Sequence, residues 1–88
     1  MNATQRLAHF ALGLNYRSIP GEVIERAKAC MLDTLAVSLY GSTKPWSRTV
    51  SGFVRDSGLR GHSTVLGEHF AAQPAQATLA NGVMAHAF

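Results

Sequence analysis

Residues 20–41 read PGEVIERAKACMLDTLAVSLYG, and this stretch decides the fold of the chain. Proline is well tolerated at the start of a helix, because its missing N–H would have no partner there. Glycine often ends a helix by adopting the left-handed conformation, and we expect Gly41 to do so. No other proline interrupts the stretch between Pro20 and Gly41. The stretch therefore predicts one long helix.

The two halves of this helix differ in their side chains. One stripe of the first half is largely apolar and contains Val23, Ala27, Cys30 and Thr34, with Ile24 and Met31 beside it. From residue 32 onward the opposite side is apolar too, through Leu32, Ala36, Leu39 and Tyr40. A helix that is apolar on all sides is enclosed by protein. Because a small domain buries only about 60% of its unfolded surface, we expect the chain to be the front part of a larger protein or half of an obligate oligomer.

Asp33 is the one charged residue in the apolar half of the helix. A buried carboxylate is costly unless it accepts hydrogen bonds or becomes neutral. Two interpretations follow: a structural carboxylate that caps a neighbouring helix or loop, or a catalytic base. We expect the first, in which the Asp33 carboxylate accepts hydrogen bonds from backbone N–H groups or an arginine in the intact protein.

The composition excludes several classes of protein. Hydrophobic residues make up 47% of the chain and charged residues 15%, which excludes a disordered chain. No apolar run is long enough to cross a membrane, and residues 1–14 lack the pattern of a signal peptide. The single cysteine, Cys30, allows no internal disulfide and favours a cytoplasmic location. The net charge is +3, but the Lys and Arg residues are scattered, so we expect no nucleic-acid partner.

Three further helices are expected around the central one. Asn2 and Gln5 form the pattern of a capping box for a first helix that ends near Gly13. Either Ser18 or Ile19 is expected to cap the central helix. A third helix is expected to run from a cap at Thr43 to a stop at Gly58. Its predicted apolar face is Trp46, Thr49, Val50, Phe53 and Val54, and its predicted polar side is Ser47, Arg48, Ser51 and Arg55.

Residues 63–66 are β-branched in part and bounded by glycines, which predicts a short extended segment. We expect it to pair outside the chain or to run as a loop. The fourth helix is expected from Pro74 to at least Ala87, without a stop signal. The predicted fold class is therefore all-α, with about four helices and one short extended segment, forming a partial N-terminal helical domain over residues 1–88.

The fourth helix carries the candidate site residue, His86. Ala75, Leu79, Gly82 and His86 lie along one predicted face. Side chains tilt toward the helix N-terminus, so His86 is expected to lean over Gly82, where space remains for a backbone or a ligand. The alternative is a packed core histidine with one hydrogen-bond partner. His62 and His69 flank the extended segment without metal-ligand spacing, so no metal site is expected.

Several phrases together resemble the start of the MmgE/PrpD family, the 2-methylcitrate dehydratase-like lyases. Each phrase is weak alone, but their order and spacing make the set specific. In chain order they are Ile19-Pro20, Ala27-Lys28, Leu32-Asp33-Thr34, Leu39-Tyr40-Gly41, Thr64-Val65-Leu66-Gly67, Ala80-Asn81-Gly82 and Ala85-His86-Ala87.

The resemblance implies a two-domain, homodimeric lyase whose larger domain is helical. Such enzymes act on small polycarboxylates by dehydration, decarboxylation or epimerisation, without an iron–sulfur cluster, so no cofactor is expected. The resemblance places His86 and Asn81 at the approach to the substrate. It places the catalytic residues mostly in and after an acidic stretch expected beyond Phe88, so none is assigned here. The chain is accordingly expected to be truncated before that stretch and inactive alone.

One alternative stays open from the sequence: a small helical interaction or nucleic-acid-binding module that is complete at 88 residues. Arg48 and Arg55 on the third helix give it some support. The sequence also leaves open which polycarboxylate is used and which of the three reactions takes place.

Overall fold

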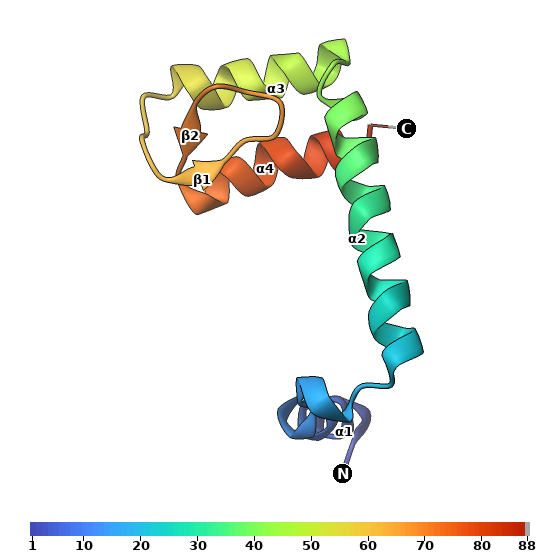
Figure 1. The fold of residues 1–88 in the computed structure, drawn as a ribbon. Helices are drawn as coiled ribbons and strands as arrows, with labels where there is room; N and C mark the ends of the chain where they lie inside the picture. Colours follow the sequence, from blue (N-terminus) through green and yellow to red (C-terminus); the bar gives the residue numbers. More distant parts are fainter. Residues whose placement is uncertain (88) are drawn as a thin grey trace. The chain divides into compact units, whose positions relative to one another are not determined.

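The computed structural model describes residues 1–87, which contain four α-helices and one two-stranded antiparallel sheet. The prediction of a mostly helical chain is confirmed. The elements are α1 (Ala3–Gly13), the 3₁₀ turn η1 (Tyr16–Ser18), α2 (Gly21–Gly41), α3 (Pro45–Asp56), β1 (Ser63–Thr64), β2 (Ala71–Ala72) and α4 (Pro74–Ala85) (Figure 1). The chain divides into two compact units, residues 1–30 and residues 31 onward.

In the first unit, the local caps determine where the helical segments begin. The Gln5 N–H donates to Asn2 Oδ1 at 2.8 Å, and the Asn2 N–H donates to Gln5 Oε1 at 3.0 Å, which confirms the predicted capping box. The sequence-based cap of α2 is wrong, because Ser18 closes a second capping box with Asn15 around η1. No residue of α1 is buried.

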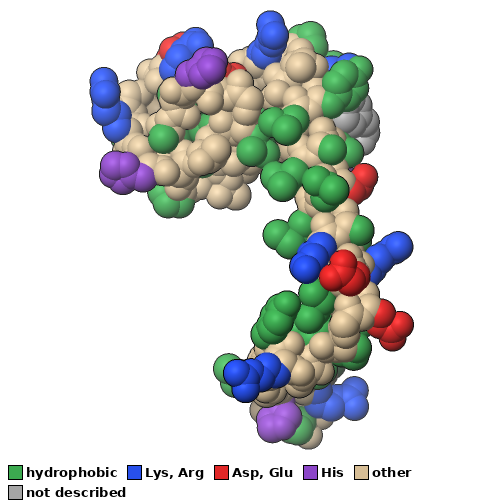
Figure 2. All heavy atoms as spheres, in the orientation of Figure 1, with side chains coloured by type: hydrophobic (Ala, Val, Ile, Leu, Met, Phe, Trp, Pro, Cys, Tyr) green, Lys and Arg blue, Asp and Glu red, His purple; other side chains and the backbone are tan. Residues whose placement is uncertain are grey.

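The face that α2 was predicted to bury is exposed. Its buried residues are Ser38 and Gly41, whereas Cys30 and Asp33 are both exposed within residues 1–87. The burial expected for the stripe that contains Cys30 is therefore wrong within these residues, whereas the pairing of Asp33, which is expected in the intact protein, stays a prediction. Hydrophobic side chains lie open along this helix (Figure 2). Periodicity shows which face of a helix favours burial, but it does not supply the element that would cover that face.

Gly41 is the last residue of α2, but it does not have the conformation that was expected. Among the described glycines only Gly58 and Gly67 have a positive φ, so Gly41 does not adopt the left-handed conformation. The backbone carbonyl of Met84 in α4 lies where a Cβ on residue 41 would stand. Glycine is therefore required at this position because two backbones approach closely.

The second unit is built on α3 and α4, which lie side by side with the β1–β2 hairpin packed on α4 (Figure 1). Ser63 pairs with Ala72 and Thr64 with Ala71. The extended segment thus finds its partner inside the chain, contrary to the prediction. The buried hydrophobic core of the described residues consists of Val54, Val65, Ala72, Ala77, Ala80 and Met84.

The buried face of α3 is rotated from the predicted one. Ser47 and Ser51, expected on the polar side, are 1% and 3% exposed, whereas Trp46 and Phe53 are 52% and 64% exposed. The facing side of α4 consists largely of alanine, and small residues on both helices let their backbones approach closely. Large aromatic side chains would force the two helices apart, so they lie outside the α3–α4 contact.

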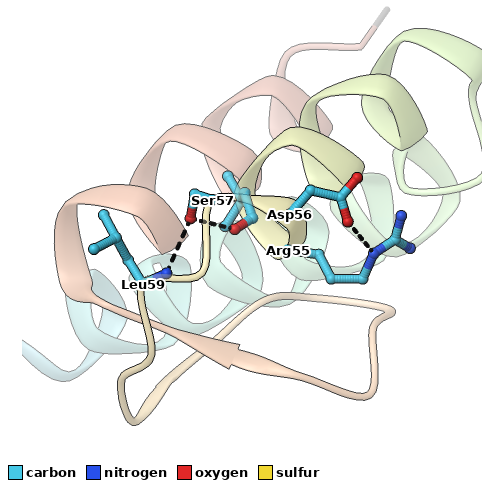
Figure 3. A network of polar contacts seen from close by, with 5 residues as sticks. Arg55, Asp56, Ser57 and Leu59 are labelled. Carbon is cyan, nitrogen blue, oxygen red and sulfur yellow. Dashed lines mark hydrogen bonds and ion pairs between the residues drawn. The ribbon is translucent and has the colours of Figure 1, made fainter.

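Side-chain hydrogen bonds at the C-terminal end of α3 determine how the chain leaves the helix (Figure 3). The Ser57 hydroxyl donates to the Val54 carbonyl at 2.7 Å and accepts from the Leu59 N–H at 3.3 Å. Gly58 follows with φ of +74°, which confirms the predicted stop. Arg55 Nε donates to Asp56 Oδ1 at 3.0 Å, and this hydrogen bond raises the pKa of Arg55 above its ordinary value.

The start of α3 and the end of α4 also differ from expectation. Lys44, not Thr43, is the N-cap of α3, and the Thr43 hydroxyl instead donates to the Tyr40 carbonyl at 2.7 Å. Helix α4 ends at Ala85 rather than continuing through Ala87. Its last turn tightens, because the Ala87 N–H bonds the Met84 carbonyl three residues back. Phe88 and the acidic stretch expected after it lie outside the described residues.

Candidate functional site

An open groove of about 550 Å³ lies between α3 and α4 in the second unit. Its volume is in the range of small-molecule sites, which is roughly 300–1,000 Å³. His86 is the one titratable side chain in its lining. The groove is lined by Trp46, Thr78, Leu79, Gly82, Val83 and His86.

His86 occupies the C-cap of α4, with φ of −113° and ψ of 21°, and it is exposed. Its backbone N–H bonds the carbonyls of Gly82 at 3.2 Å and Val83 at 3.3 Å, which fixes the backbone from which the imidazole extends. His86 is therefore not a packed core histidine within residues 1–87. An exposed imidazole can form hydrogen bonds with a carboxylate or with a neighbouring side chain.

The space predicted beside Gly82 is present. A Cβ built on Gly82 would meet no heavy atom within 4 Å. Gly82 and His86 both line the groove, as the shared helix face predicted, and Leu79 joins them. Ala75, the fourth member of the predicted face, does not line it.

Three groove residues were not predicted from the sequence, namely Thr78 and Val83 on α4 and Trp46 on α3. Trp46 is the one that another helix contributes. It was assigned to the apolar face of α3 and expected in the core, but it is half exposed and forms the groove wall on the α3 side. Trp46 is the second residue of α3, directly after a proline at the helix start. The available signal was its bulk, because a tryptophan does not fit against a helix rich in alanine.

Asn81, the other candidate site residue, does not line the groove. Its side-chain Oδ1 accepts from the Leu66 N–H at 2.9 Å, and its Nδ2 donates to the Thr64 carbonyl at 2.9 Å. The structure thus directs this amide toward the segment after β1. It brings His86 and Gly82 together with Trp46, and it places Asn81 outside that group.

Residues 1–87 contain neither a metal-binding cluster nor a helix that could span a membrane. No three His, Cys, Asp or Glu side chains gather where they could share a metal ion. None of the helices in this part of the chain is long and apolar enough to cross a membrane.

Comparison with known proteins assigns the chain that forms this groove to a protein family. The MmgE/PrpD N-terminal domain matches residues 5–88, which include the whole groove. The chain belongs to the MmgE/PrpD family. Among curated proteins, it is similar to the cis-aconitate decarboxylase-like protein oryM of Aspergillus oryzae (strain ATCC 42149 / RIB 40), at 33% identity over 81 residues. No solved structure matches significantly.

The alignment with this MmgE/PrpD relative covers very different shares of the two proteins. It covers 92% of the present chain but 17% of the relative. The residues described here therefore correspond to a small share of that protein. The resemblance found in the short phrases of the sequence is confirmed at the level of the family.

Proposed function

We propose that this chain forms the N-terminal helical part of a lyase that acts on a small polycarboxylate by removing or adding a proton next to a carboxylate. The observation that supports this function is the family match over residues 5–88. The name of the curated relative, a cis-aconitate decarboxylase-like protein, agrees with a substrate of this class. Dehydration, decarboxylation and epimerisation all remain within the proposal, because each needs a proton to be removed from or added to a carbon of the polycarboxylate. Dehydration and epimerisation remove a proton next to a carboxylate, whereas decarboxylation releases CO2 and a proton is added to the substrate carbon skeleton.

Acid–base chemistry on such a substrate needs a base, an acid for the leaving group and donors that hold the carboxylates. The groove offers His86 as its one titratable side chain. We assign His86 to substrate contact, where its imidazole would bind a carboxylate or orient a neighbouring catalytic group. One such residue does not make a complete site, so residues 1–88 alone are expected to be inactive. The remaining groups would come from the rest of the domain or from a second subunit, in a cytoplasmic homodimer.

The test uses a chimaera in which residues 1–88 replace the matching segment of the oryM protein, assayed beside the 88-residue chain alone. We expect turnover of cis-aconitate by the chimaera and none by the chain alone. His86→Ala in the chimaera should lower kcat by roughly tenfold or more, because a group that holds the substrate or a catalytic side chain in the reactive geometry typically contributes at least that factor. His62→Ala is the matched control, since His62 is exposed and does not line the groove.

The outcomes separate the parts of the proposal. Equal kcat for His86→Ala and His62→Ala in a chimaera with native circular dichroism would remove His86 from the site. The proposed substrate class would be contradicted by a folded chimaera that turns over none of three compounds, even where it binds them: cis-aconitate, 2-methylcitrate and iminodisuccinate. Measurable turnover by residues 1–88 alone would show that the site is complete without a further part.

The exposed apolar side of α2 predicts self-association of the isolated chain. Leu32 is 70% exposed and Leu39 51% exposed, and contiguous exposed apolar surface of this kind mediates association. Sedimentation velocity should show concentration-dependent dimers or larger species. Leu32→Lys with Leu39→Lys should shift the chain toward monomer, whereas Arg26→Lys should leave the distribution unchanged. A monomer at all concentrations for the unmodified chain would contradict the prediction.

A further inference from the structure

The Asn81 side chain makes the two longest-range side-chain hydrogen bonds among the described residues, spanning 15 and 17 positions of sequence. Its Oδ1 accepts from the Leu66 N–H, and its Nδ2 donates to the Thr64 carbonyl, both at 2.9 Å. In an extended chain the carbonyl before a residue and the N–H after it point to the same side. The Asn81 amide therefore bonds the backbone on both sides of Val65 as a neighbouring strand would.

The segment held by Asn81 leads directly to a close contact with the end of α2. Gly67 follows Leu66 with φ of +74°, a conformation that favours glycine. A Cβ on Gly67 would stand 2.6 Å from the Ser42 Oγ, so the two residues are in contact without space between them. The Leu66–Gly67 segment therefore packs directly against Ser42.

From Ser42 the contacts return to α4. Gly41 precedes Ser42 and lies against the backbone of Met84, which is two residues before His86. Trp46, on the opposite wall of the groove, follows Ser42 by four residues. A continuous series of contacts therefore connects Asn81, in the second half of α4, with the last turn of the same helix. It passes through the Thr64–Gly67 segment and the end of α2.

We propose that Asn81 is a positioning residue of the groove, which holds His86 and Trp46 in their relative places through the Thr64–Gly67 segment and the end of α2. The role of the groove as a substrate site rests on the proposed function, whereas the positioning of its two walls by Asn81 does not. Asn81 acts at a distance, because it does not line the groove and its amide is directed to the backbone of residues 64 and 66.

The first test is amide hydrogen exchange on the full chain, measured by NMR. In Asn81→Ala the Leu66 amide loses its acceptor and should exchange roughly tenfold faster, the factor for a hydrogen bond of ordinary net strength. Asn81→Asp keeps an acceptor for the Leu66 N–H but loses the donor to the Thr64 carbonyl, so its Leu66 amide should retain part of the protection. Gln76→Ala is the matched control, because it also removes a side-chain amide from α4. The buried Oε1 of Gln76 has no hydrogen-bond partner, so this substitution breaks no hydrogen bond at that oxygen.

The second test reports on the groove itself. Trp46 is the single tryptophan of the chain, and indole emission depends on the side chains around it. His86→Gln should therefore change the Trp46 emission at a fixed pH, because both residues line the groove. Asn81→Ala should change the emission as well, while Gln76→Ala should leave it unchanged.

Each outcome decides the proposal. Faster exchange at Leu66 and altered Trp46 emission in Asn81→Ala, with the amides of Val54 and Ala80 still protected, would support positioning. Unchanged Trp46 emission in Asn81→Ala would overturn it, as would equal acceleration of all amides, which is the signature of a purely global loss of stability. If both Asn81 variants unfold while Gln76→Ala stays folded, the local role is likewise rejected. Because no substrate is used, failure here is distinct from failure of the proposed function.

Discussion

Replacing Gly41 with alanine is expected to destabilise the unit that begins at residue 31 by about 3 kcal/mol, the upper end of the usual cost of overpacking. The new Cβ would overlap the backbone carbonyl oxygen of Met84 and stand 3.0 Å from its carbonyl carbon. A flexible side chain could turn away, but a helix backbone moves only if the whole of α4 shifts. That shift would disturb Met84, which is fully buried. Urea unfolding followed by circular dichroism at 222 nm measures the loss.

Gly82→Ala is the matched control, because it is also a helical glycine in the same unit. A Cβ at Gly82 meets nothing within 4 Å, so the substitution adds no clash. Alanine is the better helix former by roughly 0.5–1 kcal/mol, and the variant should gain about that amount of stability. Equal effects for the two variants, or a stabilised Gly41→Ala, would contradict the close approach of α2 and α4.

The parts of the fold that local chemistry determines could be predicted from the sequence. The capping box of Asn2 and Gln5 needs only residues three apart, and the structure contains it. Proline at the first turn placed the start of α4 at Pro74, and Gly58 marked the end of α3. Each of these signals acts within one turn of backbone, so a neighbour elsewhere in the chain does not change it.

The parts that depend on which surfaces meet could not be predicted. Ser47 and Ser51 appear polar in a helical projection, yet they are buried because α4 offers a face of small residues. Residues 71–72 carry no strand signal, since two alanines favour helix, and they pair with β1 because the chain returns there. Gly41 appeared to be a helix stop, and only the proximity of Met84 shows why glycine is needed.

In the candidate site, too, local features could be predicted from the sequence and contacts between separate elements could not. The open space beside Gly82 followed from helix geometry alone, because residues four apart lie on one face, and the structure confirms it. The groove wall at Trp46 and the hydrogen bonds of Asn81 connect separate elements. Their partners lie 15 or more residues away for Asn81 and on another helix for Trp46, so no local pattern identifies them.

Met84 is the centre of the small core. Its side chain is 0% exposed and is the largest among the fully buried side chains of the described residues. The other five of the six hydrophobic residues in that core are alanine or valine, each with little apolar surface of its own: Val54, Val65, Ala72, Ala77 and Ala80. A core composed of such small groups has few atoms that can move to fill a void.

Met84→Ala should therefore lower the free energy of unfolding by about 3–5 kcal/mol, the upper part of the range for truncating a buried methionine. For a domain with a total stability of roughly 5–15 kcal/mol, such a loss would unfold a large fraction of the molecules in the less stable case. Met31→Ala is the control, because Met31 also lies on a helix but is 67% exposed, and its truncation should change stability by less than about 0.5 kcal/mol. Thermal unfolding and the intensity of near-ultraviolet circular dichroism measure both variants. If Met84→Ala and Met31→Ala melt together, the core is not centred on Met84 and the packing of α4 against α2 and α3 described above is wrong.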